Sequence, residues 1–297
     1  MYRPGGISGI IYYNTQISSR HPHFISIDPE NYILVANYGS GDQGVLASFA
    51  LARDGIISNP TLLAHNPSPG GKSHIHCAEI FQSGCGVAYA AVVDLGMDTV
   101  SQYQINPLVG IASGISPTVF ITFPAGSGPR QIKFQSILPL AIVILELANA
   151  LVILPLDRNT GILTQPADIS SSTYSTLPEG NDPVQMNCGE VVISSSDSGG
   201  RFVYASNRDC TAVSTDQDAI PAQRMYRSTV AVFQIVPDGS ESYTLQLLQH
   251  VSSCGDFPRY IQLLRNGTEL VLVNQADSNF VSFLVTLSSC DFKLPAF

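Results

Sequence analysis

The chain has 297 residues, of which 44% are hydrophobic and only 12% are charged, with 24 glycines and 19 prolines. So few charges argue against long polar helices, whereas short apolar runs separated by glycine and proline are typical of an all-β protein. The net charge of −9 and the lack of a lysine and arginine cluster argue against nucleic acid as a partner.

One kind of strand recurs along the chain: an alternating apolar and polar stretch that mostly opens with a polar residue. These stretches are HFISIDP from His23, HCAEIFQ from His76, RQIKFQS from Arg130, GEVVISS from Gly189 and RYIQLLR from Arg259. Their opening residues are spaced by 53, 54, 59 and 70 residues. Recurrence at such similar intervals predicts an internal repeat.

A second kind of strand follows each of these stretches and is an apolar run that ends in a polar residue. The runs are ILVANYG with Asn37, AYAAVVDLG with Asp94, AIVILELAN with Glu146, RFVYASNRD with Asn207 and ELVLVNQAD with Asn274. A third apolar strand comes after a turn, and a fourth lies in the connection to the next unit. Turn signals such as Arg53-Asp54-Gly55 separate the third strand from the fourth.

Four strands per unit, without intervening helices, predict an all-β fold: a β-propeller of four-stranded antiparallel blades. We expect about five full blades in a single domain over residues 1–297. A β-sandwich would explain the number of strands but not a recurrent polar residue at one strand position. The start of the first strand and the end of the second are expected at the same rim of each blade, around one channel mouth.

The residues expected at this rim suit acid–base chemistry on an anionic substrate. Arginine can grip a carboxylate or phosphate, and histidine and glutamate can transfer protons. The residues expected to be catalytic are His76, Arg130, Glu146 and Arg208. The residues expected to bind substrate are His23, Asn37, Asp94, Asn207, Arg259 and Asn274. The three asparagines also suit a purely local role, in which their amides satisfy the backbone of turns.

Other kinds of site are not indicated. The six cysteines include no CxxC pair, which favours buried thiols over disulfides or zinc. His74 and His76 share a strand face, but no further metal ligands recur nearby, so we expect neither a metal nor a cofactor. No signal peptide and no run of about 18 apolar residues is visible, which predicts a cytoplasmic protein without a membrane partner.

At these residues the chain resembles the lactonase family of seven-bladed propellers, which includes 6-phosphogluconolactonases and carboxymuconate lactonizing enzymes. The segments that carry the resemblance are HPHFISIDP, ILVANYGSG, SHIHCAEI, VVDLGMDTV, GPRQIKF, ILELANAL, RFVYASNRD, FPRYIQL and LVLVNQADSN. They span nearly the whole chain, from His21 to about Thr286. The resemblance implies that His76, Arg130, Glu146 and Arg208 lie at the positions proposed as catalytic in the family.

The sequence departs from the family's pattern in three ways. Gln131 replaces a histidine in GPRH, and Leu145 and Ala148 replace the two asparagines of N-E-L-N around Glu146. The chain is also shorter than seven blades require, and we expect that one or two N-terminal blades are missing.

The resemblance implies hydrolysis of a small anionic sugar-acid lactone by a metal-independent acid–base mechanism. Two alternatives stay open at this point. The same site could close a carboxy-cis,cis-muconate to a lactone, as a cycloisomerase, or the propeller could be a non-catalytic interaction platform. The sequence leaves the oligomeric state open.

Overall fold

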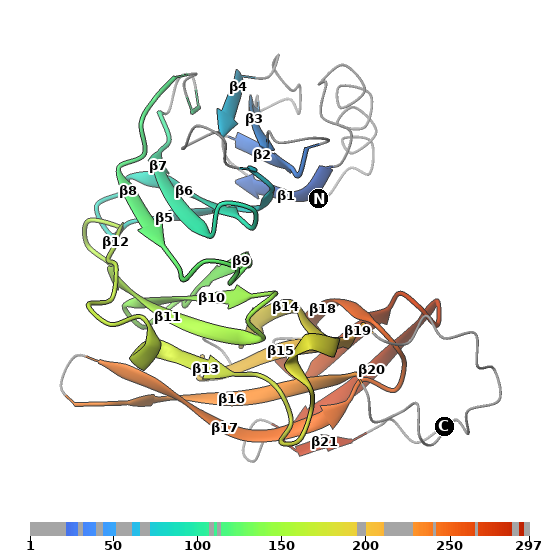
Figure 1. Cartoon of the computed structure of the whole chain (residues 1–297). Helices are drawn as coiled ribbons and strands as arrows, with labels where there is room; N and C mark the ends of the chain where they lie inside the picture. The colour runs from blue at the N-terminus through green and yellow to red at the C-terminus, as the bar shows by residue number, and fades with distance from the viewer. Residues whose placement is uncertain are drawn as a thin grey trace. The chain divides into compact units, whose positions relative to one another are not determined.

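The computed structural model describes residues 22–28, 32–39, 44–51, 61–65, 72–106, 110–111, 114–194, 200–210, 228–239, 242–264, 267–286 and 291–293. In this part of the chain the strands form five sheets, here called blades 1 to 5, and each blade keeps its strands in chain order (Figure 1). The sheets confirm the predicted all-β fold of four-stranded antiparallel units.

Blade 1 contains β1 (Pro22–Asp28), β2 (Tyr32–Asn37), β3 (Gly44–Ala50) and β4 (Thr61–His65). Blade 2 contains β5 (Ile75–Gln82), β6 (Ala88–Asp94), β7 (Thr99–Gln104) and β8 (Val119–Thr122). Blade 3 contains β9 (Pro129–Phe134), β10 (Leu140–Leu145), β11 (Ala150–Asp157) and β12 (Ile162–Leu163), with β13 (Thr173–Ser175) also paired to β11. Blade 4 contains β14 (Met186–Ile193), β15 (Phe202–Asp209), β16 (Thr229–Pro237) and β17 (Tyr243–Ser252). Blade 5 contains β18 (Pro258–Leu264), β19 (Glu269–Asn274), β20 (Asn279–Thr286) and β21 (Asp291–Lys293).

The helical elements of the described residues are two single turns of 3₁₀-helix, η1 (Ser170–Ser172) and η2 (Pro183–Gln185). Among these residues no helix has the length and apolar character that a membrane crossing requires.

The chain divides into two compact units, and the boundary between them runs through blade 3. Unit 1 comprises Met1–Ile132 and Leu156–Gln165, and unit 2 comprises Lys133–Pro155 and Pro166–Phe297. The single domain expected over residues 1–297 stays a prediction.

In each unit the core lies between the faces of neighbouring sheets. In unit 1, alternate residues of β2 such as Leu34 pack with Ile75 of β5 and Val92 of β6. In unit 2, blade 4 is buried on both faces: Val203 packs towards β10, and the next residue, Tyr204, packs towards Ile261 in blade 5. Burial on both faces explains why β15 and β10 read as nearly continuous apolar runs rather than as alternating strands.

The pairing register confirms that the start of the first strand and the end of the second strand share one rim of a blade. The pairs are Pro22 with Asn37, Ile75 with Asp94, Cys188 with Asn207, and Pro258 with Asn274. Directly after each of these pairs the register shifts by one residue on the first strand, as in a β-bulge. The extra residue is His23 in blade 1, His76 in blade 2 and Arg259 in blade 5. In blade 4 the bulge comprises residues 189–190. Bulges re-aim side chains next to functional sites.

Candidate active site

Unit 1 holds a buried pair formed by His76 and Arg130, which are each the second residue of a first strand. Nη1 of Arg130 lies 2.6 Å from Nε2 of His76, and the two residues are 6% and 7% exposed. A guanidinium has donors only, so the imidazole Nε2 must accept this hydrogen bond. His76 is therefore a neutral imidazole in this arrangement, with its hydrogen on Nδ1.

Tyr38 contacts the ring of His76, and the buried carboxylate of Asp94 holds the segment before it. The ring of Tyr38 meets His76 edge-on, with centroids 6.1 Å apart, and stacks on His74 at 4.3 Å. Asp94 is fully buried and accepts hydrogen bonds from Ser73 Oγ at 2.5 Å and from the backbone N of His74 at 2.7 Å. Asp94 thus braces the segment that leads into β5, and through it the backbone that carries His76.

Arg130 follows a tight loop that is held by Asp98, a residue that sequence reasoning missed. The Asp98 carboxylate accepts hydrogen bonds from the backbone N of Gly126 and of Gly128, both at 2.7 Å. Asp98 itself has a left-handed backbone, with φ of 54°, at the turn between β6 and β7. The carboxylate fixes the loop two residues before Arg130.

Unit 2 holds an ion pair formed by Glu146 and Arg208. Nη2 of Arg208 lies 2.7 Å from Oε1 of Glu146, and the side chains are 3% and 14% exposed. The backbone of Cys188 contacts both partners. Its carbonyl oxygen accepts from Arg208 Nη2 at 2.5 Å, and its N–H donates to the Glu146 carbonyl at 3.0 Å. The start of β14 therefore positions the pair through its backbone.

The remaining face of the Arg208 guanidinium lies over an aromatic ring. Its Cζ is 4.9 Å from the centroid of Phe257, within the range of a cation–π interaction. Nε of Arg208 is buried and has no hydrogen-bond partner among the described residues. Sequence reasoning did not select Phe257.

The register corrects the repeat alignment in blade 3. In three blades the polar residue at the end of the second strand pairs with the first residue of the third strand; these residues are Asp94, Asn207 and Asn274. In blade 3 the residue that pairs in this way is Leu145, whose partner is Ala150. Glu146 therefore lies one residue beyond the position of those polar residues. It is the counterpart of Arg208, which lies one residue beyond Asn207.

The three asparagines expected at the substrate have amides that bond the backbone. All three are fully buried. The Nδ2 of Asn37 donates to the Val45 carbonyl at 3.1 Å, that of Asn207 to Thr176 at 2.6 Å, and that of Asn274 to Ser253 at 3.0 Å. The contacts of Asn207 and Asn274 reach backbone that is 31 and 21 residues away in the sequence, so these amides join separate segments of the chain.

The structure describes the side chain of one of the two remaining expected rim residues, Arg259, but not that of the other, His23. Arg259 is partly buried, and its Nη1 donates to Oε1 of Gln275 at 3.3 Å. His23 lies in β1, but its side chain is outside the described part of the chain.

Gly189 marks a rim position that has no room for a side chain. A Cβ there would lie 2.6 Å from the carbonyl oxygen of Pro258 and would collide with Oγ of Ser206. The described residues contain no group of three or more potential metal ligands.

Comparison with known proteins identifies the family. The sequence model described as "Lactonase, 7-bladed beta-propeller" matches residues 11–294. The chain belongs to this lactonase family. A 6-phosphogluconolactonase of Bacillus subtilis (strain 168) is 27% identical over 273 residues, which are 90% of this chain and 67% of that protein.

Solved structures share the fold of this chain. The periplasmic gluconolactonase PpgL of Pseudomonas aeruginosa superposes with a TM-score of 0.71 and is 23% identical, over 94% of this chain and 70% of that chain. A protein from Lactobacillus plantarum has a TM-score of 0.65 and 22% identity, over 94% of this chain and 84% of that chain. At these identities the likeness shows the fold alone.

Proposed function

We propose that this lactonase-family protein hydrolyses the lactone of a small anionic sugar acid, such as a phosphorylated aldonolactone. The observation that carries the proposal is that each unit pairs a buried arginine with a group able to transfer a proton: Arg130 with His76, and Arg208 with Glu146. The 6-phosphogluconolactonase relative supports the choice of substrate.

The two arginines are proposed to bind the acid group and to polarise the lactone carbonyl. A fixed cation next to this oxygen stabilises the negative charge that develops when water attacks the carbonyl carbon. Arginine suits these tasks because its planar guanidinium is always charged and can donate two parallel hydrogen bonds to a carboxylate or phosphate.

Glu146 is proposed as the base, because it is the carboxylate of the ion pair and can accept a proton from the attacking water. The water oxygen bonds to the carbonyl carbon, the bond to the ring oxygen breaks, and the leaving alkoxide receives the proton. Glu146 is proposed to return this proton, while His76 orients Arg130 by accepting its hydrogen bond.

The test is a rate measurement on purified protein with 6-phosphogluconolactone and with unphosphorylated gluconolactone, each compared with spontaneous hydrolysis in buffer. We expect clear acceleration, a higher kcat/KM for the phosphorylated substrate, and no loss of rate after treatment with EDTA. Rates equal to buffer for a panel of aldonolactones would contradict the proposal. A preference for the uncharged lactone would contradict its anionic part.

A further inference from the structure

Two blades place different residues at the same unusual backbone position. Blade 3 enters its first strand through Gly128-Pro129-Arg130, and blade 5 enters through Phe257-Pro258-Arg259. The residue before the proline has φ of 62° at Gly128 and 64° at Phe257. The loop geometry is therefore repeated, but the residue type is not.

Glycine adopts this left-handed conformation freely, whereas a bulky aromatic residue is strained in it. Such strain persists only where the surroundings hold it, and it is concentrated at functional sites. Blade 3 shows that a glycine fits the repeat at this position. Something in blade 5 must therefore favour a side chain that is unfavourable for the local backbone.

The backbone of Phe257 is held from both sides. Its N–H donates to Oγ of Ser228 at 3.3 Å, and its carbonyl accepts from the N–H of Gln275 at 2.9 Å. The same Ser228 Oγ, which is fully buried, accepts from the N–H of Asp209 at 3.1 Å. One hydroxyl thus ties Phe257 to the residue next to Arg208.

The ring of Phe257 meets Arg208 rather than the hydrophobic core. It is only partly buried, and it is not one of the described residues that form the apolar cluster between blades 4 and 5. Its centroid lies 4.9 Å from the Cζ of Arg208. The other described partners of that guanidinium, Glu146 and the Cys188 carbonyl, both bind through Nη2. Both hydrogen bonds therefore lie at one end of the guanidinium, and the ring contacts it at its central carbon.

We propose that Phe257 is a positioning residue, retained in a strained conformation because its ring holds the Arg208 guanidinium in place beside its two Nη2 hydrogen bonds. The inference rests on the proposed function only in that Arg208 is the group that meets the substrate. The arrangement of ring and guanidinium is a separate claim and has a readout of its own.

The first experiment separates the ring from the backbone with four variants. Phe257→Tyr keeps the ring and should retain wild-type kcat/KM. Phe257→Leu, Phe257→Ala and Phe257→Gly lack a ring, and each should lose about tenfold in kcat/KM, the order expected for a desolvated cation–π contact. Phe257→Gly should melt at a higher temperature than Phe257→Ala, because only glycine relieves the strain. Stability and activity then change independently, which a merely structural role would not produce.

Cys254 supplies the matched control, because it lies in the same loop and also has a left-handed backbone, with φ of 52°. Cys254→Gly should leave kcat/KM unchanged, although it removes a side chain that packs against the apolar cluster between blades 4 and 5. Loss of activity in this variant would show that the loop's backbone, and not the ring, supports Arg208, and would overturn the proposal. Wild-type kcat/KM in Phe257→Leu would overturn it as well.

A spectroscopic measurement tests the positioning even if the protein has no lactonase activity. In a ¹⁵N–¹H spectrum, the Arg208 Nε–H signal, assigned by its loss in Arg208→Lys, should be shifted upfield by the ring current. It should keep this shift in Phe257→Tyr and lose it in Phe257→Leu. An unchanged signal in Phe257→Leu would refute the contact. A ring-dependent signal in a protein that does not hydrolyse lactones would support the positioning and refute the proposed function alone.

Discussion

The two arginine pairs show how one residue type is used for two tasks. In unit 1 the guanidinium of Arg130 donates to the imidazole of His76. In unit 2 the guanidinium of Arg208 donates to the carboxylate of Glu146, so the two charges compensate each other. On the basis of this difference we propose an electrophilic role for the first pair and a basic role for the second.

The supports behind the two pairs also differ. Arg130 follows a loop in which the Asp98 carboxylate binds backbone N–H groups of two glycines, so its support acts through the main chain. Arg208 lies against the ring of Phe257 and the carbonyl of Cys188, so side-chain packing takes part in its support. Variants that remove one support at a time can test this contrast.

The largest effect is expected from Glu146→Gln, which keeps the shape of the side chain but removes the proposed base. General base catalysis contributes about 10²–10⁴-fold, so kcat should fall by that order while the fold is retained. Steady-state kinetics and circular dichroism measure the two quantities. Unchanged kcat would remove Glu146 from the mechanism.

A smaller loss is expected from Arg130→Gln, which can still donate to His76 but carries no charge. If Arg130 stabilises the developing oxyanion, kcat should fall by about 10²–10³-fold. Arg130→Lys, which keeps the charge and loses the planar fork, should recover part of the rate. Equal rates for the Gln and Lys variants would show that charge at this position is unimportant and would end the electrophilic assignment.

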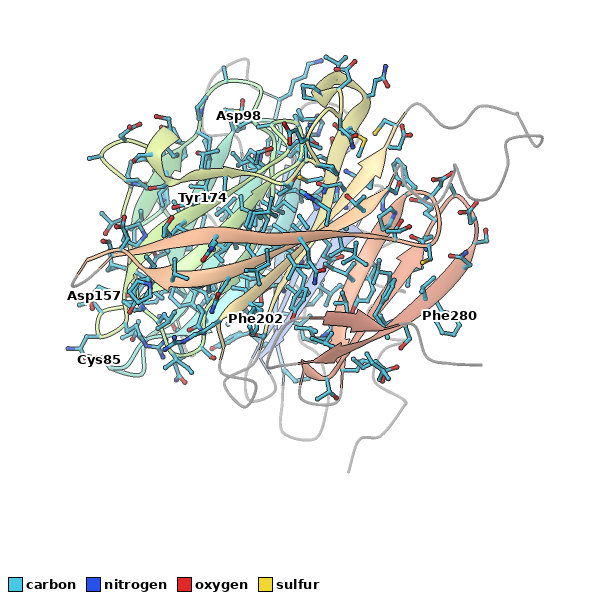
Figure 2. The ribbon with its side chains drawn as sticks, turned by 90° about the horizontal axis from the view of Figure 1, so that it is seen from below. Cys85, Asp98, Asp157, Tyr174, Phe202 and Phe280 are labelled. Atoms are coloured by element: carbon cyan, nitrogen blue, oxygen red, sulfur yellow. The ribbon has the colours of Figure 1, made fainter. Side chains whose placement is uncertain are left out.

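A loss of about tenfold in kcat/KM is expected from Asp98→Asn. The amide offers one acceptor oxygen in place of the two that hold Gly126 and Gly128, and hydrogen bonds to a charged carboxylate are stronger than those to a neutral amide. Asp157→Asn is the matched control. Asp157 also accepts from backbone N–H groups in a turn of unit 1, those of Asn159 and Thr160, but that turn bonds Gly84 at the opposite end of blade 2. Figure 2 shows Asp98 and Asp157 at separate turns. Equal kcat/KM in the two variants would contradict a specific role for Asp98.

The smallest effect concerns the stability of unit 2 in mild acid. Nε2 of His250 in β17 lies 2.9 Å from the Thr176 carbonyl, which also accepts from Asn207. Burial lowers the pKa of His250, so the unfolded chain binds its proton more readily than the folded chain does. Stability from this group is complete above the unfolded pKa, near 6.5, and is lost as the pH falls towards the folded value.

Urea unfolding of the wild type and His250→Gln, between about pH 7 and pH 5, measures this effect, because glutamine can donate to Thr176 without titrating. The wild type should lose more stability than the variant over that interval. Parallel losses would show that other groups cause the acid sensitivity.

Much of the fold could be predicted because similar residue types recur at equivalent positions of the repeat. Polar residues at strand ends and turn dipeptides indicated the four-stranded units, and the register confirmed the shared rim. The alignment was off by one residue at Glu146 because Leu145 is apolar where the other blades have asparagine or aspartate. A polarity rule cannot detect such an exception, whereas the backbone pairing shows it directly.

The supporting residues could not be found from the sequence for a different reason. Asp98 and Phe257 act from left-handed backbone positions, and neither residue type signals such a position as glycine does. Their roles depend on which backbone N–H groups or guanidinium the chain folds against them. An acidic residue in the turn just before β7 could have drawn attention to Asp98. Nothing in the run SCGDFPRY indicates that the ring of Phe257 contacts an arginine.

Gly189 sets a limit on how this protein could be redesigned. A repeated architecture invites the transfer of a side chain from one blade to the equivalent position of another, such as the histidine of blade 2 into blade 4. At Gly189 any such graft would have to displace the Pro258 carbonyl, which also accepts a hydrogen bond of 3.0 Å from Ser206. New chemistry in blade 4 is therefore best introduced at the end of its second strand, where Arg208 already shows that a long side chain fits.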